Sequence, residues 1–475
     1  MSERKIGTVL VANRGEIAVR IIRAAREYGL QTVAIYSDAD EGALHVRLAD
    51  KRVALGGNSA RDSYLSQDKI LNAAILSGAD AVHPGYGFFA ENAEFARALE
   101  RAGLTFIGPD PAVIGLMGDK DQARRKAAES GVPVVPGTEA GLSPDALQKF
   151  CKKIGYPVMI KAVAGGSGRG MRLVEKEAEL GDKLLEAQAE AEAAFRNRDV
   201  IVEKYLGRPR HIEVQVFGDA HGNVLHFGER ECSLQRRHQK VVEESPAAFF
   251  HPAVRARMLE SAVALAKAVG YRGAGTMEFL VEDGTTAESP FYFLEMNTRI
   301  QVEHAVTEAV TGIDLLKLQF HVAEGKPLPM EQSAVQSRGH AIEFRVYAED
   351  PSQGFKPTSG TVRYISRLGG AGLREDAWVE AGTQVSAYYD SLLSKLTVWG
   401  ASREEAIRRS VAVLGELVVE GMETTLGFHR WVVRQPAFRD GPLDVKWIER
   451  EYRGELVSAI GVGPLVLPPL RESKS

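Results

Sequence analysis

Polar side chains occupy alternate positions in the segment FLEMNTRIQVEH, residues 293–304. The odd-numbered polar residues are Glu295, Asn297, Arg299, Gln301 and Glu303. Alternate side chains of an extended chain point to the same face, so this spacing lines up two carboxylates, two amides and a guanidinium. A half-exposed strand with a solvated face has the same pattern. Other motifs must decide whether this face is solvated or forms a functional site.

A further carboxylate lies in a similar strand-like segment. GTMEFLVED, residues 275–283, carries Glu278 among apolar neighbours, as FYFLEMN carries Glu295 and Asn297. Oxygen ligands of this kind suit Mg²⁺ or Mn²⁺, with nucleotide phosphates and water completing the coordination. Each glutamate alone is equally consistent with a charge at the rim of a sheet. Together with a phosphate-binding loop, they favour a metal–nucleotide site.

The candidate phosphate-binding loop is MIKAVAGGSGRGM, residues 159–171, in which Lys161 ends a strand and glycines follow. Glycines let backbone N–H groups approach phosphate oxygens without a Cβ in the way. The loop is not a Walker A loop, because the lysine precedes the glycines. A flexible hairpin is the alternative, and Lys161 and Lys120 are individually surface lysines by default.

A basic run follows in LQRRHQKVVEE, residues 234–244, which contains Arg236, Arg237, His238 and Lys240. A solvated loop is one interpretation. The functional interpretation is a wall that binds phosphate or a small oxyanion.

An α/β unit opens the chain. TVLVA, residues 8–12, predicts a buried strand, and QTVAIYS, residues 31–37, predicts the next. The helix expected between them has its apolar positions at Ile17, Ile21, Ala24 and Tyr28. Gly29 follows as its C′ residue. With further strands up to residue 109, this pattern predicts an open parallel sheet covered by helices.

Two further regions follow. Proline and glycine density over residues 132–144 predicts a hinge, and the unit up to about residue 205 predicts a mobile lid. Strand-rich sequence continues to residue 304. HAIEFRVYAED then places Glu343 and Arg345 on one strand face, and a long helix is expected from residue 402.

The composition is that of a globular protein. With 475 residues, 44% hydrophobic and 26% charged, the chain predicts roughly three domains. A net charge of −4 gives no indication of a nucleic-acid or membrane surface, and no apolar run is long enough for a membrane span. Cys151 and Cys232 are expected to be packing thiols without a disulfide. A cytoplasmic location fits this cysteine usage and the absence of a signal region.

The motifs occur in the order Lys120, Lys161 with its glycine loop, Glu203, SLQRRHQKVVEE, Glu278, EMNTRIQVEH and Arg345. In this order the chain resembles the biotin carboxylase family of ATP-grasp enzymes from about residue 5 to 450. VANRGEIA and HPGYGF match the same family. QRRHQK and NTRIQVEH are highly specific to this family, unlike the glycine loop.

The resemblance implies a three-domain α/β protein. We expect a Rossmann-like (pre-ATP-grasp) domain over residues 1–115, an ATP-grasp domain over 116–335 with a mobile lid at about 136–206, and a C-terminal α+β domain over 336–450. A tail of residues 451–475 is expected to be poorly ordered.

The resemblance also implies a reaction and its residues. In the family, ATP phosphorylates bicarbonate to carboxyphosphate, which delivers CO₂ to N1′ of biotin. Glu303 matches the general base, Arg345 the group that steadies the biotin ureido oxygen, and Lys240 and Arg299 further catalytic positions. Glu278, Glu295 and Asn297 match the ligands of Mg²⁺ or Mn²⁺. The implied nucleotide and bicarbonate contacts are Lys120, Lys161, Gly166, Ser167, Gly168, Glu203, Lys204, Leu206, His211, Gln235, His238, Gln301 and the backbone of Val302.

Departures from the family pattern occur at Val163, Ala164, Ser167, Phe89-Ala90 and Ala305, and none removes a functional side chain. The chain contains no Met-Lys pair of the kind that carries biotin. We therefore expect a subunit that acts on biotin attached to a carrier protein, beside a carboxyltransferase. The resemblance also implies a homodimer. Acetyl-CoA or another acyl-CoA is the expected final acceptor, as in fatty acid biosynthesis.

Other functions fit the same sequence features. Pyruvate and 2-oxoglutarate carboxylases have similar subunits. A different ATP-grasp ligase of the carbamoyl-phosphate synthetase group also phosphorylates bicarbonate, although QVEH and Arg345 argue against it. A non-catalytic subunit that binds nucleotide for assembly is the rival from another class.

Overall fold

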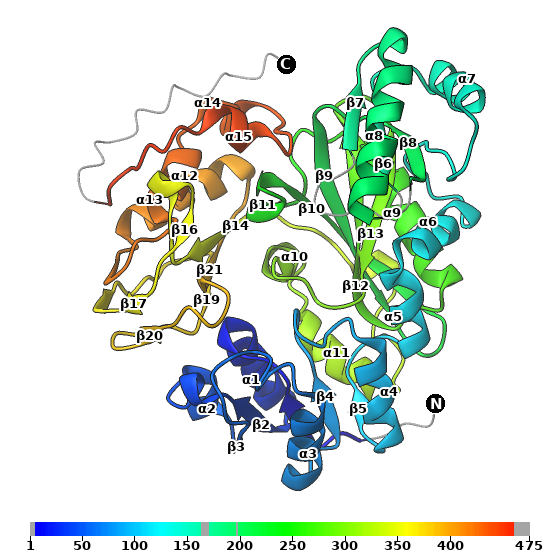
Figure 1. Ribbon diagram of the computed structural model, residues 1–475. Coiled ribbons are helices and arrows are strands. Elements are labelled where there is room, and N and C mark those ends of the chain that lie inside the picture. Colours follow the sequence, from blue (N-terminus) through cyan, green and yellow to red (C-terminus); the bar gives the residue numbers. More distant parts are fainter. Residues whose placement is uncertain (1–4, 163–170, 196–197, 460–475) are drawn as a thin grey trace.

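The computed structural model describes residues 5–162, 171–195 and 198–459. Three regions follow one another along the chain (Figure 1), and the N-terminal region lies below a large sheet. No helix of the described part of the chain is both long and apolar enough to cross a membrane.

The N-terminal region is a parallel sheet, as the sequence predicts. Its strand order is β3-β2-β1-β4-β5. The strands are β1 (Thr8–Val11), β2 (Gln31–Tyr36), β3 (Lys51–Ala54), β4 (Ala81–His83) and β5 (Thr105–Phe106). The helices are α1 (Gly15–Tyr28), α2 (Leu44–Leu48), α3 (Gln67–Ser77) and α4 (Ala93–Arg101). Alternate residues of β1 enter two different apolar clusters, Val9 that of α1 and Leu10 that of α3 and α4. The sheet is therefore buried on both faces.

The second region supplies the first five strands of an eight-stranded antiparallel sheet, in the order β13-β12-β9-β10-β11-β14-β21-β19. These strands are β9 (Pro209–Gly218), β10 (Val224–Arg236), β11 (Gln239–Ser245), β12 (Gly273–Glu282) and β13 (Phe291–Asn297). The helices are α5 (Pro111–Gly118), α6 (Lys120–Glu129), α9 (Pro252–Ala268), α10 (His304–Thr311) and α11 (Leu315–Ala323). One sheet face packs on α9 through residues such as Met258 and Phe279.

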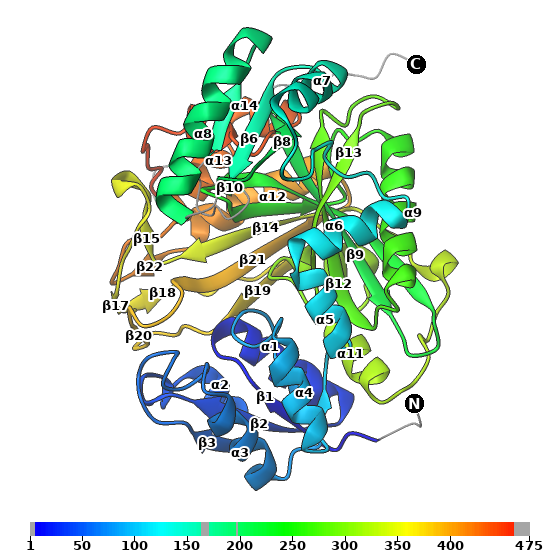
Figure 2. The ribbon, with the colours of Figure 1, turned by 45° about the vertical axis from the view of Figure 1, so that its right-hand side comes forward.

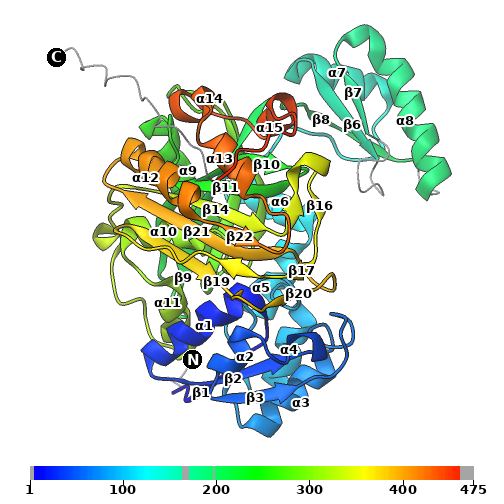
Figure 3. The ribbon, with the colours of Figure 1, turned by 90° about the vertical axis from the view of Figure 1, so that its left-hand side faces the viewer.

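A small unit projects from the second region (Figure 3). It contains α7 (Pro144–Ile154), α8 (Leu180–Phe195) and the three-stranded sheet β7-β6-β8, with β6 (Val158–Ala162), β7 (Met171–Val174) and β8 (Val200–Lys204). Its apolar cluster is separate from the others and includes Leu147, Cys151 and Leu184. A unit with its own core can move as a body, which is consistent with the predicted lid.

The third region completes the large sheet (Figure 2) with β14 (His340–Tyr347), β21 (Leu392–Gly400) and β19 (Leu373–Ala377). Short strands surround it: β15 (Glu349–Asp350), β16 (Lys356–Pro357), β17 (Gly360–Thr361), β18 (Tyr364–Ile365), β20 (Gln384–Val385) and β22 (Val419–Glu420). The helices are α12 (Arg403–Glu416), α13 (Leu426–Val432), α14 (Pro436–Asp440) and α15 (Trp447–Glu451). Ile342, Phe344 and Val346 of β14 face the apolar core, so Glu343 and Arg345 lie on the opposite face.

The structure differs from the sequence pattern after Asn297, where β13 ends. Residues 298–303 belong to no helix or strand, although the polar alternation continues through them. Ile300 packs into the apolar core beside α11, while Thr298 and Arg299 are held by Glu91 of the N-terminal region. These contacts draw the chain out of the sheet and lead it to α10.

Candidate active site

A largely buried ammonium group joins three carboxylates within the large sheet. Lys240 of β11 lies with its Nζ 2.5 Å from Glu213 Oε2, 2.8 Å from Glu278 Oε1 and 2.8 Å from Glu303 Oε1. Burial alone would lower the pKa of Lys240, but the three carboxylates outweigh it and hold this pKa well above its ordinary value. Lys240 is therefore a permanent cation in this site.

Glu303 lies between two cations. Its Oε1 contacts Lys240, and its Oε2 accepts from Arg345 Nη2 at 2.9 Å. Burial would raise the pKa of Glu303, but Lys240 and Arg345 outweigh it and hold this pKa well below its usual range. The side chain is fully buried and ionised, which is the state that a proton acceptor needs, and its two cationic partners weaken it as a base until a bound anion shares them.

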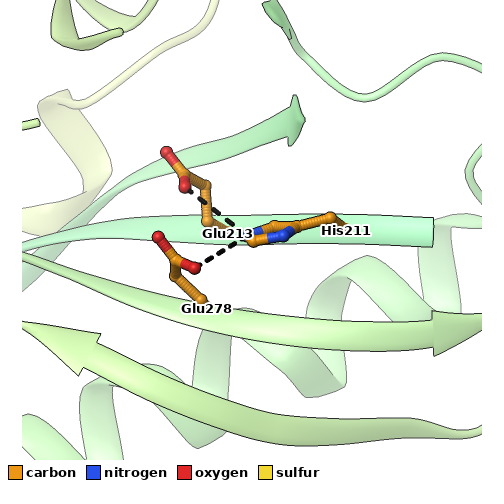
Figure 4. Close-up of side chains that lie close together, drawn as sticks. All are labelled: His211, Glu213 and Glu278. Atoms are coloured by element: carbon orange, nitrogen blue, oxygen red, sulfur yellow. Dashed lines mark ion pairs between the residues drawn. The ribbon is translucent and has the colours of Figure 1, made fainter. Parts of the chain in front are cut away.

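Polar groups of β9, of β13 and of the segment after β13 surround Glu278, and Figure 4 shows the two on β9, His211 and Glu213. His211 Nε2 lies 2.9 Å from its Oε2, and Asn297 Nδ2 and Gln301 Nε2 donate to its Oε1. Gln235 Nε2 lies 2.8 Å from His211 Nδ1. If that amide donates, His211 presents its Nε2–H to Glu278, so the partner fixes the tautomer. Burial opposes ionisation of Glu278, but Lys240 and His211 hold its pKa well below the ordinary value.

A second carboxylate faces Glu278 across the sheet. Glu278 and Glu295 are direct partners of β12 and β13, and Asn297 is two residues further along β13. Burial, and then the charge of Glu278, raise the pKa of Glu295. The two facing carboxylates are hard-oxygen donors of the kind that Mg²⁺ or Mn²⁺ prefers, and a divalent cation would relieve their repulsion. Asn297 Oδ1 would join them after exchanging its hydrogen bond from Arg299 for the metal. These residues fit the metal that the sequence motifs imply.

The irregular segment 298–303 brings its polar side chains back to this cluster. Arg299 donates to Asn297 Oδ1 at 2.9 Å and to Gln301 Oε1 at 3.0 Å. Its Nε donates to Glu91 Oε2 at 2.9 Å. The guanidinium is thereby fixed beside Gln301 and close to the segment that ends at Glu303.

The other predicted nucleotide contacts lie on the projecting unit and on α6. Lys161 of β6 donates to Glu203 Oε2 at 2.5 Å, and Arg124 donates to Glu203 Oε1 at 2.7 Å. Leu206 is buried beyond β8. Lys120, at the first turn of α6, is exposed with its Nζ 3.9 Å from Glu295 Oε2. An exposed lysine at a helix N-terminus is available to an anion.

Some predicted residues lie outside this cluster. Lys204 donates to Glu282 Oε1 at 2.7 Å. His238 is exposed at the turn between β10 and β11, where its φ is 67°. Gly166, Ser167 and Gly168 lie outside the described residues. The nucleotide roles of these five residues stay predictions.

A cleft of about 600 Å³ opens onto the cluster. Its lining includes Arg299, Val302 and Arg345, together with Tyr86 of the N-terminal region and Trp378 of the third region. Arg345 also lies against Glu243 Oε1 at 2.5 Å, so this guanidinium spans two buried carboxylates, Glu243 and Glu303. The cleft is large enough for a small ring system to reach Arg345, which binds Glu303 behind it.

Sequence reasoning missed several groups of the site. The carboxylate of Glu213 forms ion pairs with both Lys240 and Arg230, and the Arg230 side chain is fully buried. The alternation of His211, Glu213 and Gln215 in HIEVQVF is a signal that could have identified it. Cys232 was expected to be a packing thiol, yet its Sγ lies 3.9 Å from Glu303 Oε1. Cys151 is buried in the projecting unit, as expected.

Family models cover most of the chain in three consecutive parts. Residues 5–114 match the biotin carboxylase N-terminal domain, 119–331 the ATP-binding domain of the carbamoyl-phosphate synthase L chain, and 343–450 the biotin carboxylase C-terminal domain. Biotin carboxylase 1 of Bacillus subtilis is 47% identical over 445 residues, which is 94% of this chain and 98% of the relative.

This chain belongs to the biotin carboxylase family.

Other members of the biotin carboxylase family are similar. The methylcrotonoyl-CoA carboxylase alpha subunit of rice, a mitochondrial protein, is 49% identical over 95% of this chain, which spans 61% of the rice protein's length. A biotin carboxylase of Campylobacter jejuni in complex with β,γ-ATP has a TM-score of 0.84 and 44% identity, covering 94% of this chain and 99% of that one. The biotin carboxylase domain of a thermophilic 2-oxoglutarate carboxylase bound to bicarbonate has a TM-score of 0.89 and 43% identity, covering 94% and 98%.

The family membership confirms the predicted three-part α/β architecture. It identifies the chain as an ATP-grasp ligase and leaves the roles of individual residues to be tested.

Proposed function

We propose that this chain uses ATP and bicarbonate to carboxylate biotin carried on a partner protein, giving ADP and phosphate. The observation that carries the proposal is the position of Glu303. It is ionised, fully buried and held between Lys240 and Arg345 beside a cleft. Bicarbonate is a weak nucleophile until its proton is removed, and a fixed carboxylate beside two cations supplies a base and charge stabilisation together.

The nucleotide lies between the projecting unit and the large sheet in this proposal. Lys120 and Lys161 neutralise phosphate charge, and His211 and Glu203 provide further polar contacts. Glu278, Glu295 and Asn297 would hold Mg²⁺, and Mn²⁺ suits the same oxygen donors. When bound, the metal would offset the negative charge of the nucleotide phosphates.

Bicarbonate lies between Arg299, Gln301 and the backbone of Val302. A guanidinium fork matches two of its oxygens, and Lys240 adds a second positive charge. Glu303 takes the proton from bicarbonate. One bicarbonate oxygen then bonds to the γ-phosphorus while the bond from that phosphorus to the ADP oxygen breaks, giving carboxyphosphate and ADP.

Biotin enters through the cleft and meets Arg345, which lines it. Carboxyphosphate divides into CO₂ and phosphate, phosphate takes the N1′ proton of biotin, and N1′ bonds to CO₂. Arg345 steadies the negative charge that develops on the ureido oxygen. The closed lid keeps water from the reactive intermediate.

The partners in this proposal are a biotin carboxyl carrier protein and a carboxyltransferase. An acyl-CoA is the proposed final acceptor, which agrees with the rice methylcrotonoyl-CoA carboxylase subunit. A keto acid is the alternative acceptor, because the domain of a 2-oxoglutarate carboxylase is also similar to this chain. Assay of the assembled enzyme against acetyl-CoA, other acyl-CoAs, pyruvate and 2-oxoglutarate decides between them.

A homodimer in the cytoplasm completes the proposal. Both cysteines of the described chain are free and buried, which suits a reducing compartment. Light scattering that gave the mass of a single chain at micromolar concentration would contradict the dimer.

The phosphoryl acceptor is tested directly with bicarbonate whose oxygens are all ¹⁸O. Attack by bicarbonate leaves one ¹⁸O in each phosphate released, because the bridging oxygen stays on phosphorus when CO₂ departs. Phosphate without label would show that water is the acceptor, and the proposed reaction would then be wrong. The Glu303→Gln variant is the matched control, in which labelled phosphate should form far more slowly.

A further inference from the structure

The proposed bicarbonate pocket lies on a segment without regular hydrogen bonding. Residues 298–303 connect β13 to α10 and belong to no helix or strand. Some of their backbone groups have local partners, such as the Gln301 carbonyl, which lies 2.7 Å from His304 Nδ1, and others need partners from elsewhere in the molecule. At one end, the Thr298 N–H donates to Glu91 Oε1 at 3.1 Å. At the other end, the Val302 carbonyl accepts from Lys395 Nζ at 2.6 Å.

Lys395 is an unusual residue for such a contact. It lies in the middle of β21, opposite Arg345 of β14, and its side chain is fully buried. Burying an ammonium is costly unless it is paired and hydrogen-bonded. Burial lowers the pKa of Lys395, but Glu16, Glu343 and Asp376 together raise it above the ordinary value, so the group stays charged.

The charge and the hydrogen bond of Lys395 have different partners. Its Nζ lies 3.6 Å from Glu16 Oε2 and 3.8 Å from Asp376 Oδ2, distances that balance charge without a short hydrogen bond. The short contact goes to the Val302 carbonyl. Glu16 lies on α1, Asp376 on β19 and Val302 between β13 and α10, so Lys395 joins all three regions of the chain.

We propose that Lys395 is a positioning residue that sets the bicarbonate pocket by holding the Val302 carbonyl. The proposal rests on the proposed function and adds a residue to it. Val302 is flanked by Gln301, which reaches Glu278, and by Glu303, which Lys240 and Arg345 hold. The Val302 peptide therefore lies between the oxyanion contacts and the base.

The expected effect follows from this position. Without the Lys395 donor, the 298–303 segment keeps its Glu91 end but loses its fixed point at Val302. A displacement on the order of 1 Å at a reacting group costs about 10²-fold in rate. The nucleotide contacts on β6, β8 and α6 lie on other elements. Loss of the Lys395 donor should therefore weaken the use of bicarbonate and leave the affinity for ATP unchanged.

The test compares three variants of the full chain. Lys395→Met removes the donor and the charge at similar volume. Glu343→Gln is the matched control, because Glu343 balances the charge of Lys395 without forming the Val302 hydrogen bond. The double variant Lys395→Met/Glu343→Gln removes one charge of each sign and leaves Asp376 paired with Arg374. It is expected to fold even if the single lysine variant does not, because an unpaired buried charge is what destabilises most.

Steady-state ADP release is measured against bicarbonate and against ATP, with thermal unfolding as a check on folding. In the two lysine variants the KM for bicarbonate should rise at least about tenfold, while the KM for ATP stays within about twofold. Glu343→Gln should leave both constants within about twofold of the unaltered protein.

An unchanged bicarbonate KM in the lysine variants, or an equal rise in both constants, would overturn the proposal. A double variant that does not fold would show that Lys395 is needed for folding, and this result would also overturn the proposal. If the unaltered protein cleaves ATP without any dependence on bicarbonate, the proposed function itself fails, and the role of Lys395 with it.

Discussion

At the residue scale, the site depends on buried charges that are fixed by charges of opposite sign. Lys240 holds Glu213, Glu278 and Glu303 together, and Arg345 spans Glu243 and Glu303. Removing one member of such a group leaves its partner buried without compensation, which costs more than the pair contributes. A substitution that keeps shape and polarity limits this cost, whereas a truncation must be compared across two activities measured in the same samples.

The Glu303→Gln variant keeps the shape of the side chain and removes its basicity. We expect biotin-dependent ADP release to fall by about 10²–10⁴-fold, because proton removal from bicarbonate loses its base. Nucleotide affinity should stay close to that of the unaltered protein, since the nucleotide contacts lie elsewhere. Turnover near the normal rate would remove Glu303 from the role of base.

Arg345→Ala separates the two half-steps of the reaction. We expect carboxylation of free biotin to fall by about 10²-fold and bicarbonate-dependent ATP cleavage to fall much less, because Arg345 is proposed to act on biotin. Both rates are measured in the same samples. An equal loss in both would mean that Arg345 supports the site as a whole through Glu303 and Glu243.

Local spacing predicted part of this cluster and missed another part. Glu278, Glu295, Asn297 and Glu303 were predicted from their alternation and motifs, and the structure brings them together. Glu91 was missed because it is 208 residues away from Arg299 along the chain. Lys395 was missed because a lysine inside an apolar strand carries no spacing signal that separates it from an ordinary surface lysine.

At the element scale, the end of α1 was predicted and strand continuity was not. Gly29 ends α1 in the left-handed conformation, as predicted, and α12 begins one residue after the expected start, with Ser402 accepting from Glu405 N–H. These signals act within one turn of chain. The end of β13 at Asn297 depends instead on Ile300 reaching a distant core and on Glu91, so the alternation alone could not locate it.

The projecting unit of α7, β6, β7, β8 and α8 should respond to nucleotide. We expect MgATP to slow tryptic cleavage within residues 136–206, because a closed lid has fewer exposed sites. In Lys161→Ala, protection should require at least about tenfold more MgATP, since a charged contact to phosphate is lost. Cleavage that is indifferent to MgATP in the unaltered protein would contradict the lid assignment.

The contact of β11 with β14 and α12 predicts an acid-dependent loss of stability. Glu244 Oε2 lies 2.6 Å from His340 Nε2 and 2.7 Å from Arg403 Nε. Burial opposes ionisation, but Arg403 and His340 outweigh it and lower the pKa of Glu244 to about 2. A carboxyl whose pKa is depressed by folding stabilises the protein above its unfolded pKa, and this contribution is lost as the pH falls from about 4.5 toward 2.

Glu244→Gln should therefore lower the free energy of unfolding at pH 7 by about 3 kcal/mol, with the difference narrowing as the pH falls below about 4.5. Thermal unfolding between pH 7 and pH 3 measures it. Glu404→Gln is the control, because the Glu404–Arg408 pair is exposed and should contribute little at any pH. A difference for Glu244→Gln that is the same at pH 7 and pH 3 would contradict this account.

At the scale of the whole molecule, the active site exists where three regions meet. The second and third regions share one eight-stranded sheet, in which β11 pairs with β14. The N-terminal region contributes Glu91, which binds Arg299 of the 298–303 segment, and Glu16, which lies beside Lys395. Composition and motif order predicted three regions and their family, but the continuous sheet is a long-range pairing that no local pattern encodes.

The central claim is that this molecule couples ATP cleavage to the carboxylation of biotin. The most direct measurement is ADP release with MgATP and bicarbonate, with and without free biotin, in the unaltered protein and in Glu303→Gln. We predict that release depends on bicarbonate, increases with biotin, and falls in the variant. Bicarbonate-dependent release that is indifferent to biotin would contradict the claim and indicate another ATP-grasp acceptor, and no release under any combination would indicate a non-catalytic subunit.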